Sequence, residues 1–235
     1  MKKVIVLIGN YGSGKTEIAV NLAVRGADSG LRTLVIDLDK VNDYFRMSDR
    51  VSLLADKKIG VVTPTHAGQG VTPVNMAAAV ASAFTDNWDL VIFDVGGDSA
   101  GALSLGRYHQ DFEALEPGSL EVYDIVNIFR PMSETPDKIL RLKDEMSGFA
   151  RQEITGFVNN SNLLTYASAD DIRKGYDVVR EASEMSGIPV ALTTGREECL
   201  NEFLKDGRDP KYIGEPVPLT PYMHRSWEAF TKNGF

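Results

Sequence analysis

The chain has 235 residues, of which 43% are hydrophobic and 25% are charged, so it has far too much apolar content for a disordered protein. The formal net charge of -8 argues against a surface that binds nucleic acid non-specifically, because such a surface needs an excess of Lys and Arg. The single cysteine, Cys199, excludes an internal disulfide and cannot by itself form a paired-thiolate metal site. The length predicts one domain over residues 1–235.

Short apolar runs alternate with stretches of helical spacing along the whole chain. The predicted strands are residues 3–8, 33–37, 58–62, 90–94, 120–128, 153–158 and 189–192. The predicted helices are residues 15–29, 73–84, 100–115, 136–149 and 169–186, and residues 205–221 are expected to form an ordered loop before a short helix at 223–232. This alternation predicts an α/β protein with a three-layer fold, in which a mostly parallel twisted sheet has helices on both faces.

The first apolar run, residues 4–8, ends at Gly9. A signal peptide needs about 7–15 apolar residues and a membrane span about 20, so neither is predicted there or elsewhere, and we expect a cytoplasmic protein. Three apolar residues of the last predicted helix, Met223, Trp227 and Phe230, fall near one face. We interpret them as docking onto the core, so a membrane partner is not expected.

Residues 9–16 read Gly-Asn-Tyr-Gly-Ser-Gly-Lys-Thr, directly after the first predicted strand and directly before the first helix. They match the Walker A pattern G-x-x-x-x-G-K-[ST], in which backbone N–H groups and a helix N-terminus surround phosphate groups. A lysine there contacts the β- and γ-phosphates, and the Thr hydroxyl ligates magnesium. The predicted nucleotide-binding residues of this segment are Gly9, Asn10, Gly12, Ser13, Gly14, Lys15, Thr16 and Glu17.

The second and fourth predicted strands each end in a carboxylate. Asp37 and Asp39 follow the second strand, and a cation or an attacking water is expected where parallel strands end. Asp39 is predicted to orient water or contact the metal, with Asp37 as its support; the alternative is that both are solvated loop acids. The fourth strand ends at Asp94, a predicted Walker B magnesium ligand, and Gly97 can bring its amide close to the γ-phosphate.

Together these motifs resemble the P-loop ATPases that include MinD, ParA and the nucleotide-binding domains of cobyrinic acid amide synthases (the CobQ/CobB/MinD/ParA family). The resemblance covers about the first 100 residues and implies an ATPase, a hydrolase that uses ATP and Mg²⁺. It also implies that Asn159, after the sixth predicted strand, contacts adenine; the alternative is a turn residue. Residues 159–162, Asn-Asn-Ser-Asn, lack the Asp of a guanine-reading Asn-Lys-x-Asp, so ATP is preferred over GTP.

One position departs from the family. MinD and ParA carry a second lysine after the first glycine of the loop, which reaches across a homodimer to the partner's phosphates, whereas Asn10 stands here. The chain resembles a bacterial branch that lacks this lysine. An amide cannot neutralise phosphate charge, so Lys40, Arg46 or Arg107 would have to substitute if a dimer forms in this way.

Two functions fit these patterns. The first is a nucleotide-driven switch, in which ATP holds the loops after Asp37 and Asp94 for an unknown protein partner and hydrolysis releases them. The second is an ATP-dependent enzyme acting on a small molecule, an amide synthase-like ligase or a kinase. Turnover stimulated by a protein would favour the first, and turnover that depends on an added metabolite would favour the second.

Overall fold

A single all-parallel sheet forms the centre of the molecule. The computed structural model describes residues 2–39, 51–63, 73–163 and 166–223, and within these ranges eight strands pair in the order β3-β2-β4-β1-β5-β6-β7-β8. The strands are β1 (Lys3–Ile8), β2 (Thr33–Asp37), β3 (Gly60–Val62), β4 (Leu90–Asp94), β5 (Leu120–Val126), β6 (Gly156–Asn159), β7 (Val190–Gly195) and β8 (Glu215–Pro218). Because every pair is parallel, all the carboxyl ends lie along one edge of the sheet.

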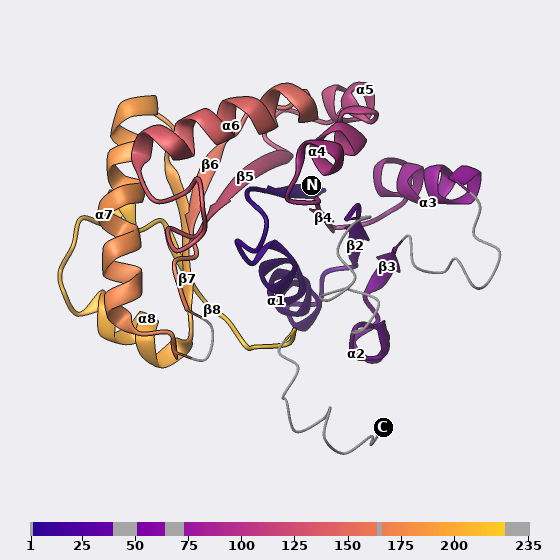
Figure 1. The fold of residues 1–235 in the computed structure, drawn as a ribbon. Helices are drawn as coiled ribbons and strands as arrows, with labels where there is room; N and C mark the ends of the chain where they lie inside the picture. The colour runs from indigo at the N-terminus through magenta and orange to yellow at the C-terminus, as the bar shows by residue number, and fades with distance from the viewer. Residues whose placement is uncertain (1, 40–50, 64–72, 164–165, 224–235) are drawn as a thin grey trace, which may run out of the picture.

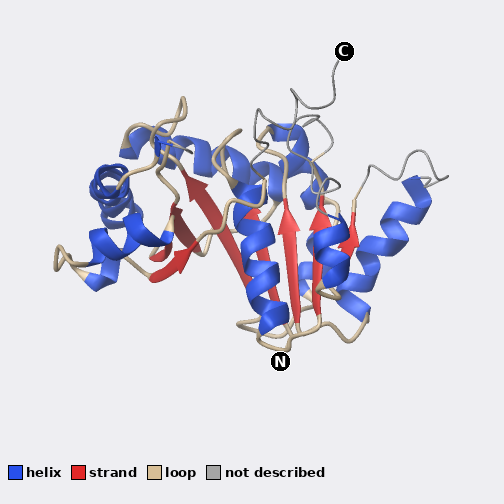
Figure 2. Ribbon diagram, turned by 90° about the horizontal axis from the view of Figure 1, so that it is seen from below, coloured by secondary structure: helices blue, strands red, loops and turns tan. Residues whose placement is uncertain are grey.

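Helices cover both faces of this sheet (Figure 1). They are α1 (Lys15–Asp28), α2 (Val51–Asp56), α3 (Pro73–Thr85), α4 (Ser99–Gly106), α5 (His109–Glu113), α6 (Pro136–Ala150), α7 (Ala169–Ser186) and α8 (Glu197–Leu204). The view in Figure 2 shows the strand arrows between two layers of helices. The predicted three-layer α/β architecture is confirmed.

Alternation along the strands builds the two layers of core. In β1, Ile5 and Leu7 face α1, whereas Val4, Val6 and Ile8 belong to the cluster that includes buried residues of α3, α4, α5 and α6. All five of these side chains are buried, as expected for a central strand covered on both sides. The segment after β1, residues 9–14, is therefore attached to a buried central strand of the sheet.

The helix predicted at residues 100–115 is two helices. α4 ends at Gly106 and α5 begins at His109, with Tyr108 between them. A Cβ on Gly106 would lie 2.7 Å from the carbonyl oxygen of Phe149 at the end of α6, so α4 comes close to α6 at this point. The turn then directs Phe112 into the core beside Phe84 and Phe93.

The loop predicted at residues 205–221 contains strand β8, and the prediction missed helices α2 and α8. β8 carries Pro216 and Pro218, which lack an N–H and therefore argue against a strand in the sequence. At the edge of the sheet they are tolerated, because β8 pairs only with β7 among the described strands. The helix predicted at residues 223–232 lies outside the described residues, apart from Met223. The remaining predicted strands and helices are present, with ends that differ by a few residues.

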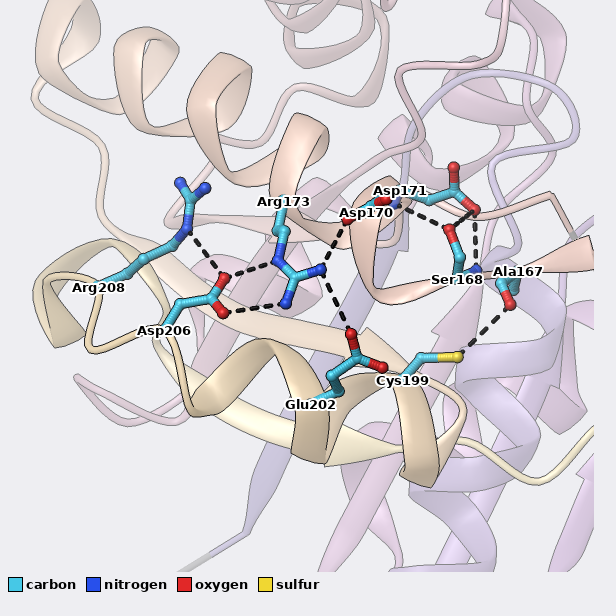
Figure 3. A network of polar contacts seen from close by, with 9 residues as sticks. All are labelled: Ala167, Ser168, Asp170, Asp171, Arg173, Cys199, Glu202, Asp206 and Arg208. Atoms are coloured by element: carbon cyan, nitrogen blue, oxygen red, sulfur yellow. Dashed lines mark hydrogen bonds and ion pairs between the residues drawn. The ribbon is translucent and has the colours of Figure 1, made fainter.

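A polar network joins α7 to α8 and to the turn that follows it (Figure 3). Arg173 donates to both carboxylate oxygens of Asp206, at 2.7 and 2.9 Å, and to Asp170 at 2.6 Å. At the start of α7 the hydroxyl of Ser168 accepts from the N–H of Asp171, whose carboxylate accepts from the N–H of Ser168. This capping box fixes the first turn of α7, and the arginine network fixes α8 against it.

Some predictions concern residues outside the described ranges: Lys40, Arg46, Trp227 and Phe230. Among the residues that the structure does describe, no helix is long and apolar enough to cross a membrane. The same residues contain no group of three or more His, Cys, Asp or Glu side chains that could by itself hold a metal ion.

Candidate functional site

The segment between β1 and α1 curls through three glycines in left-handed conformations. Gly9, Gly12 and Gly14 have φ angles of 136°, 72° and 94°, a region that side chains rarely adopt. A Cβ on Gly9 would lie 2.5 Å from the carbonyl oxygen of Ile125 in β5. The predicted Walker A segment therefore forms a tight bend that requires glycine and leads directly into the N-terminus of α1.

Lys15 is the first residue of α1, and its side chain reaches back to the start of this bend. Its side chain is buried, and its Nζ donates to the carbonyl oxygens of Gly9 at 3.1 Å and Asn10 at 2.8 Å. Burial lowers the pKa of the Lys15 ammonium. The neighbouring carboxylates act against that shift: Asp94, Asp39, Asp124 and Asp98.

The Thr16 hydroxyl donates to Oδ2 of Asp94 at 2.6 Å, so the structure brings together two of the three predicted magnesium ligands. Asp94 ends β4 and lies beside Asp37 of β2 in the parallel register. Burial raises the pKa of both carboxyl groups, and the charge of Asp94 raises that of Asp37 further. A hydroxyl and a carboxylate at this distance match the hard oxygen ligands that Mg²⁺ prefers, and a cation would favour the ionised carboxylate.

Asp39 lies between the end of β2 and the loop after β4. Its N–H donates to Oδ1 of Asp37 at 2.9 Å, which is the supporting contact expected of Asp37. A Cβ on Gly96 would lie 3.4 Å from Oδ1 of Asp39. A Cβ on Gly97 would lie 2.6 Å from the backbone of Tyr11 and 2.9 Å from Nζ of Lys15, so the loop after β4 is in direct contact with the phosphate-loop segment.

Two adjacent asparagines at the end of β6 have different partners. Asn159 is buried, donates to the carbonyl oxygen of Ile172 at 3.1 Å and accepts from the N–H of Ser161 at 3.2 Å. Asn160 donates to the carbonyl oxygen of Ser13 at 2.7 Å. The predicted base contact of Asn159 is untested, but its amide is engaged with α7 and the following turn, whereas Asn160 touches the Walker A segment.

Glu17, in the first turn of α1, contacts a segment near the other end of the described chain. Its carboxylate accepts from the N–H groups of Tyr222, at 2.7 Å, and Met223, at 3.1 Å. One turn further along α1, the amide of Asn21 makes two hydrogen bonds to the backbone of Thr220. The structure thus gives Glu17 a role in holding residues 220–223 against α1.

Ser13 lies inside the bend and is fully buried. Among the residues that the structure describes, its hydroxyl has no hydrogen-bond partner, and such buried atoms are rare in folded proteins. The missing partner is consistent with a polar ligand at this segment.

Arg107, suggested above as a substitute for the second lysine, follows the end of α4 and is exposed.

Sequence reasoning missed two other residues near the bend. Asp124, on β5 beside Ile8 of β1, is buried, and burial raises its pKa to about 7. Arg130 donates from Nε to the carbonyl oxygen of Gly12 at 2.9 Å. The available signal for Asp124 was an acid in the middle of the mostly apolar run of residues 120–128, which also contains Glu121. Nothing in the sequence near Arg130 singles it out.

The sequence matches no protein-family model and no curated protein. Its fold is similar to that of solved FtsY structures. FtsY from Mycoplasma mycoides has a TM-score of 0.57 and 16% identity, over 83% of this chain and 61% of that one. Cell division protein FtsY from Thermotoga maritima has a TM-score of 0.56 and 19% identity, over 85% and 63%.

A third similar structure is the signal recognition particle receptor FtsY from Elizabethkingia anophelis in complex with GDP. It has a TM-score of 0.54 and 20% identity, over 85% of this chain and 58% of that one. The chain thus matches about three fifths of the length of these structures. At such identities the likeness establishes the fold, which is the α/β fold of P-loop NTPases.

Proposed function

We propose that this protein is a Mg²⁺-dependent nucleoside triphosphatase of the MinD/ParA-like class, which prefers ATP to GTP and acts as a nucleotide-driven switch for a protein partner. The observation that carries the proposal is the left-handed glycine bend of residues 9–14, which continues into α1 with Lys15 and Thr16 at its first turn. Amide groups and a helix N-terminus arranged in this way suit a polyphosphate. The GDP complex of a structure with a similar fold supports a nucleotide as the ligand.

Within this proposal each residue has a defined task. Lys15 supplies a buried ammonium for the β- and γ-phosphates, and the amide groups of the bend hold the phosphate oxygens. Thr16 and Asp94 would hold Mg²⁺, with Asp39 as a further predicted ligand, and the bound ion would offset the charge of the phosphates. Asp39 orients the attacking water, and Asp37 holds the backbone of Asp39 in place.

The proposed preference for ATP rests on the residues after β6. Asn160, which bonds the Walker A segment, is followed by Ser161, Asn162 and Leu163, so no carboxylate stands where a guanine-reading motif would have one. Discrimination for guanine normally uses such a carboxylate as acceptor for two N–H groups of the base, and an unpaired base donor is costly. ATP is therefore the expected nucleotide.

Titration calorimetry with Mg-ATP and Mg-GTP tests the proposal, combined with a phosphate-release assay. The Lys15→Ala variant should lose about 100-fold in ATP affinity, on the order of 3 kcal/mol. Lys174→Ala is the matched control, because Lys174 is an exposed lysine of α7. If the wild-type protein gives no binding heat with either nucleotide at millimolar concentration, the proposed function is wrong.

The same assay separates the switch from the second candidate, a small-molecule enzyme. For a switch, phosphate release is slow and increases when a protein partner is added. If phosphate release instead required an added metabolite and formed a phosphorylated or ligated product, the switch proposal would be replaced.

A further inference from the structure

The loop between β5 and α6 lies against the glycine bend. β5 is the direct neighbour of β1, so the segments that leave the carboxyl ends of these two strands are adjacent. Arg130 is four residues beyond the end of β5. Its Nε donates to the carbonyl oxygen of Gly12 at 2.9 Å, and a Cβ on Gly12 would lie 3.2 Å from that nitrogen. The guanidinium thus contacts the Walker A segment at Gly12, near its middle.

The loop that carries Arg130 is held from both sides. Asn127 is buried; its amide donates to the carbonyl oxygen of Asn162 at 3.1 Å, and its own carbonyl accepts from the N–H of Arg130 at 3.0 Å. On the other side, the amide of Asn10 donates to the carbonyl oxygen of Pro131. These contacts fix the backbone on either side of Arg130, so little conformational freedom remains to be lost when a ligand binds.

The guanidinium of Arg130 has no carboxylate partner among the described residues, in contrast with several other arginines. Arg32, for example, is paired with Asp89, and Arg173 with Asp206. Lys15, the other cation at the bend, has carboxylates around it that offset its charge. Arg130 therefore contributes positive charge at the glycine bend that no acid of the described chain neutralises by contact.

We propose that Arg130 supplies, from the same chain, a second positive charge that contacts the terminal phosphate of a bound nucleoside triphosphate. This inference rests on the proposed function and assigns a residue to it. A guanidinium presents several N–H groups in a planar fork that matches phosphate oxygens, and it stays charged at any physiological pH. The neighbouring Asn10 cannot supply this charge, because its side chain is an amide bonded to Pro131 and to the N–H of Tyr11.

The test compares Arg130→Ala and Arg130→Lys with the wild-type protein. A non-hydrolysable triphosphate analogue and the diphosphate are titrated by calorimetry, phosphate release is measured, and thermal unfolding checks the fold. Arg130→Ala should lower triphosphate affinity about 10-fold and turnover about 100-fold or more, with diphosphate affinity changed less than about 3-fold. Arg130→Lys keeps the positive charge but loses the planar guanidinium, so its triphosphate affinity and turnover should lie between those of Arg130→Ala and wild type.

The matched control is Arg141→Ala, because Arg141 is an exposed arginine of α6, and this variant should behave as wild type. Wild-type affinity and turnover in a folded Arg130→Ala protein would overturn the inference and leave the proposed function standing. Equal losses for diphosphate and triphosphate, together with a lower melting temperature, would also overturn it, because they indicate a purely structural role. Absence of nucleotide binding by the wild-type protein would refute the proposed function itself.

Discussion

The buried carboxyl groups of the central strands, Asp37, Asp94 and Asp124, differ in their surroundings. Asp94 has the Thr16 hydroxyl as a partner, and Asp37 has the N–H of Asp39. For Asp124, the nearby charges of Lys15 and Lys143 are the only described groups that favour ionisation, and burial outweighs them. Of the three, Asp124 is the one with no task in the proposed function, so its replacement is expected to change stability.

Replacement of Asp124 by Asn should make stability less dependent on pH. The pKa of Asp124 is about 7 in the folded protein and about 4 when unfolded, so between these values the folded state alone holds the proton. Stability of the wild-type protein therefore falls as pH rises from about 4 to about 7, by about 1.4 kcal/mol per pH unit from this group. The difference in free energy of unfolding between the variant and wild type should therefore shift in favour of the variant by on the order of 3 kcal/mol from pH 5 to pH 8.

Urea unfolding at pH 5 and pH 8 measures this difference. Glu116→Gln is a suitable control, because Glu116 is an exposed acid and should show no such change between the two pH values. A difference between Asp124→Asn and wild type that is the same at both pH values would contradict the assignment.

At the scale of the elements, the loop that joins β4 to α4 is fitted to the segment that joins β1 to α1. Gly97 touches the backbone of Tyr11, and Asp98 caps α4 by accepting from the N–H of Gly101 at 2.7 Å. A change in the backbone conformation of one loop must therefore displace the other. In the proposed switch, this contact would let the two loops respond together to a bound phosphate.

Gly97→Ala should force these two loops apart. The added methyl group would lie 2.6 Å from backbone atoms of Tyr11, which cannot move as a flexible side chain would, so we expect a loss of about 1–3 kcal/mol in stability. In the exposed part of α6, a Cβ on Gly148 would have no neighbouring atom within 4 Å. Gly148→Ala should therefore increase stability by about 0.5–1 kcal/mol. Chemical denaturation of both variants checks the pair, and equal effects would refute the proposed contact.

Sequence periodicity predicted the layers and most elements because the buried strands are nearly continuous apolar runs, as in residues 4–8 and 90–94. It failed where tertiary contacts decide the local structure. β8 exists in spite of two prolines because it is an edge strand, and the helix at 100–115 divides where Gly106 meets α6. The Walker A residues were identified from a contiguous motif, whereas Arg130 lies 118 positions from Gly12 and is brought there only by the pairing of β5 with β1.

At the scale of the whole molecule, residues 220–223 close the structure by returning to α1. Glu17 accepts from the N–H groups of Tyr222 and Met223. The side-chain amide of Asn21 donates to the carbonyl oxygen of Thr220 and accepts from its N–H. Met223 is buried in the cluster that also contains Ile18 and Val217. The helix that follows the glycine bend is thus packed between the sheet and a segment from the other end of the described chain.

Glu17→Ala should release this segment. Loss of charge-assisted hydrogen bonds to two backbone N–H groups is expected to cost about 1–3 kcal/mol and to speed amide hydrogen exchange in residues 220–223. Mass spectrometry of deuterated peptides measures the exchange, with Glu181→Ala, an exposed acid of α7, as the control. Unchanged protection of this segment would show that Glu17 does not hold it.

This closure has a consequence for synthesis on the ribosome. Glu17 and the backbone of Tyr222 are 205 positions apart, so the helix that begins at Lys15 cannot acquire these partners until nearly all of the described chain has been translated. At about 5–20 residues per second, the delay is on the order of 10–40 s. During that interval Met223 cannot cover the apolar side of α1 against which it packs, so nascent chains should be open to aggregation or chaperone capture at this surface.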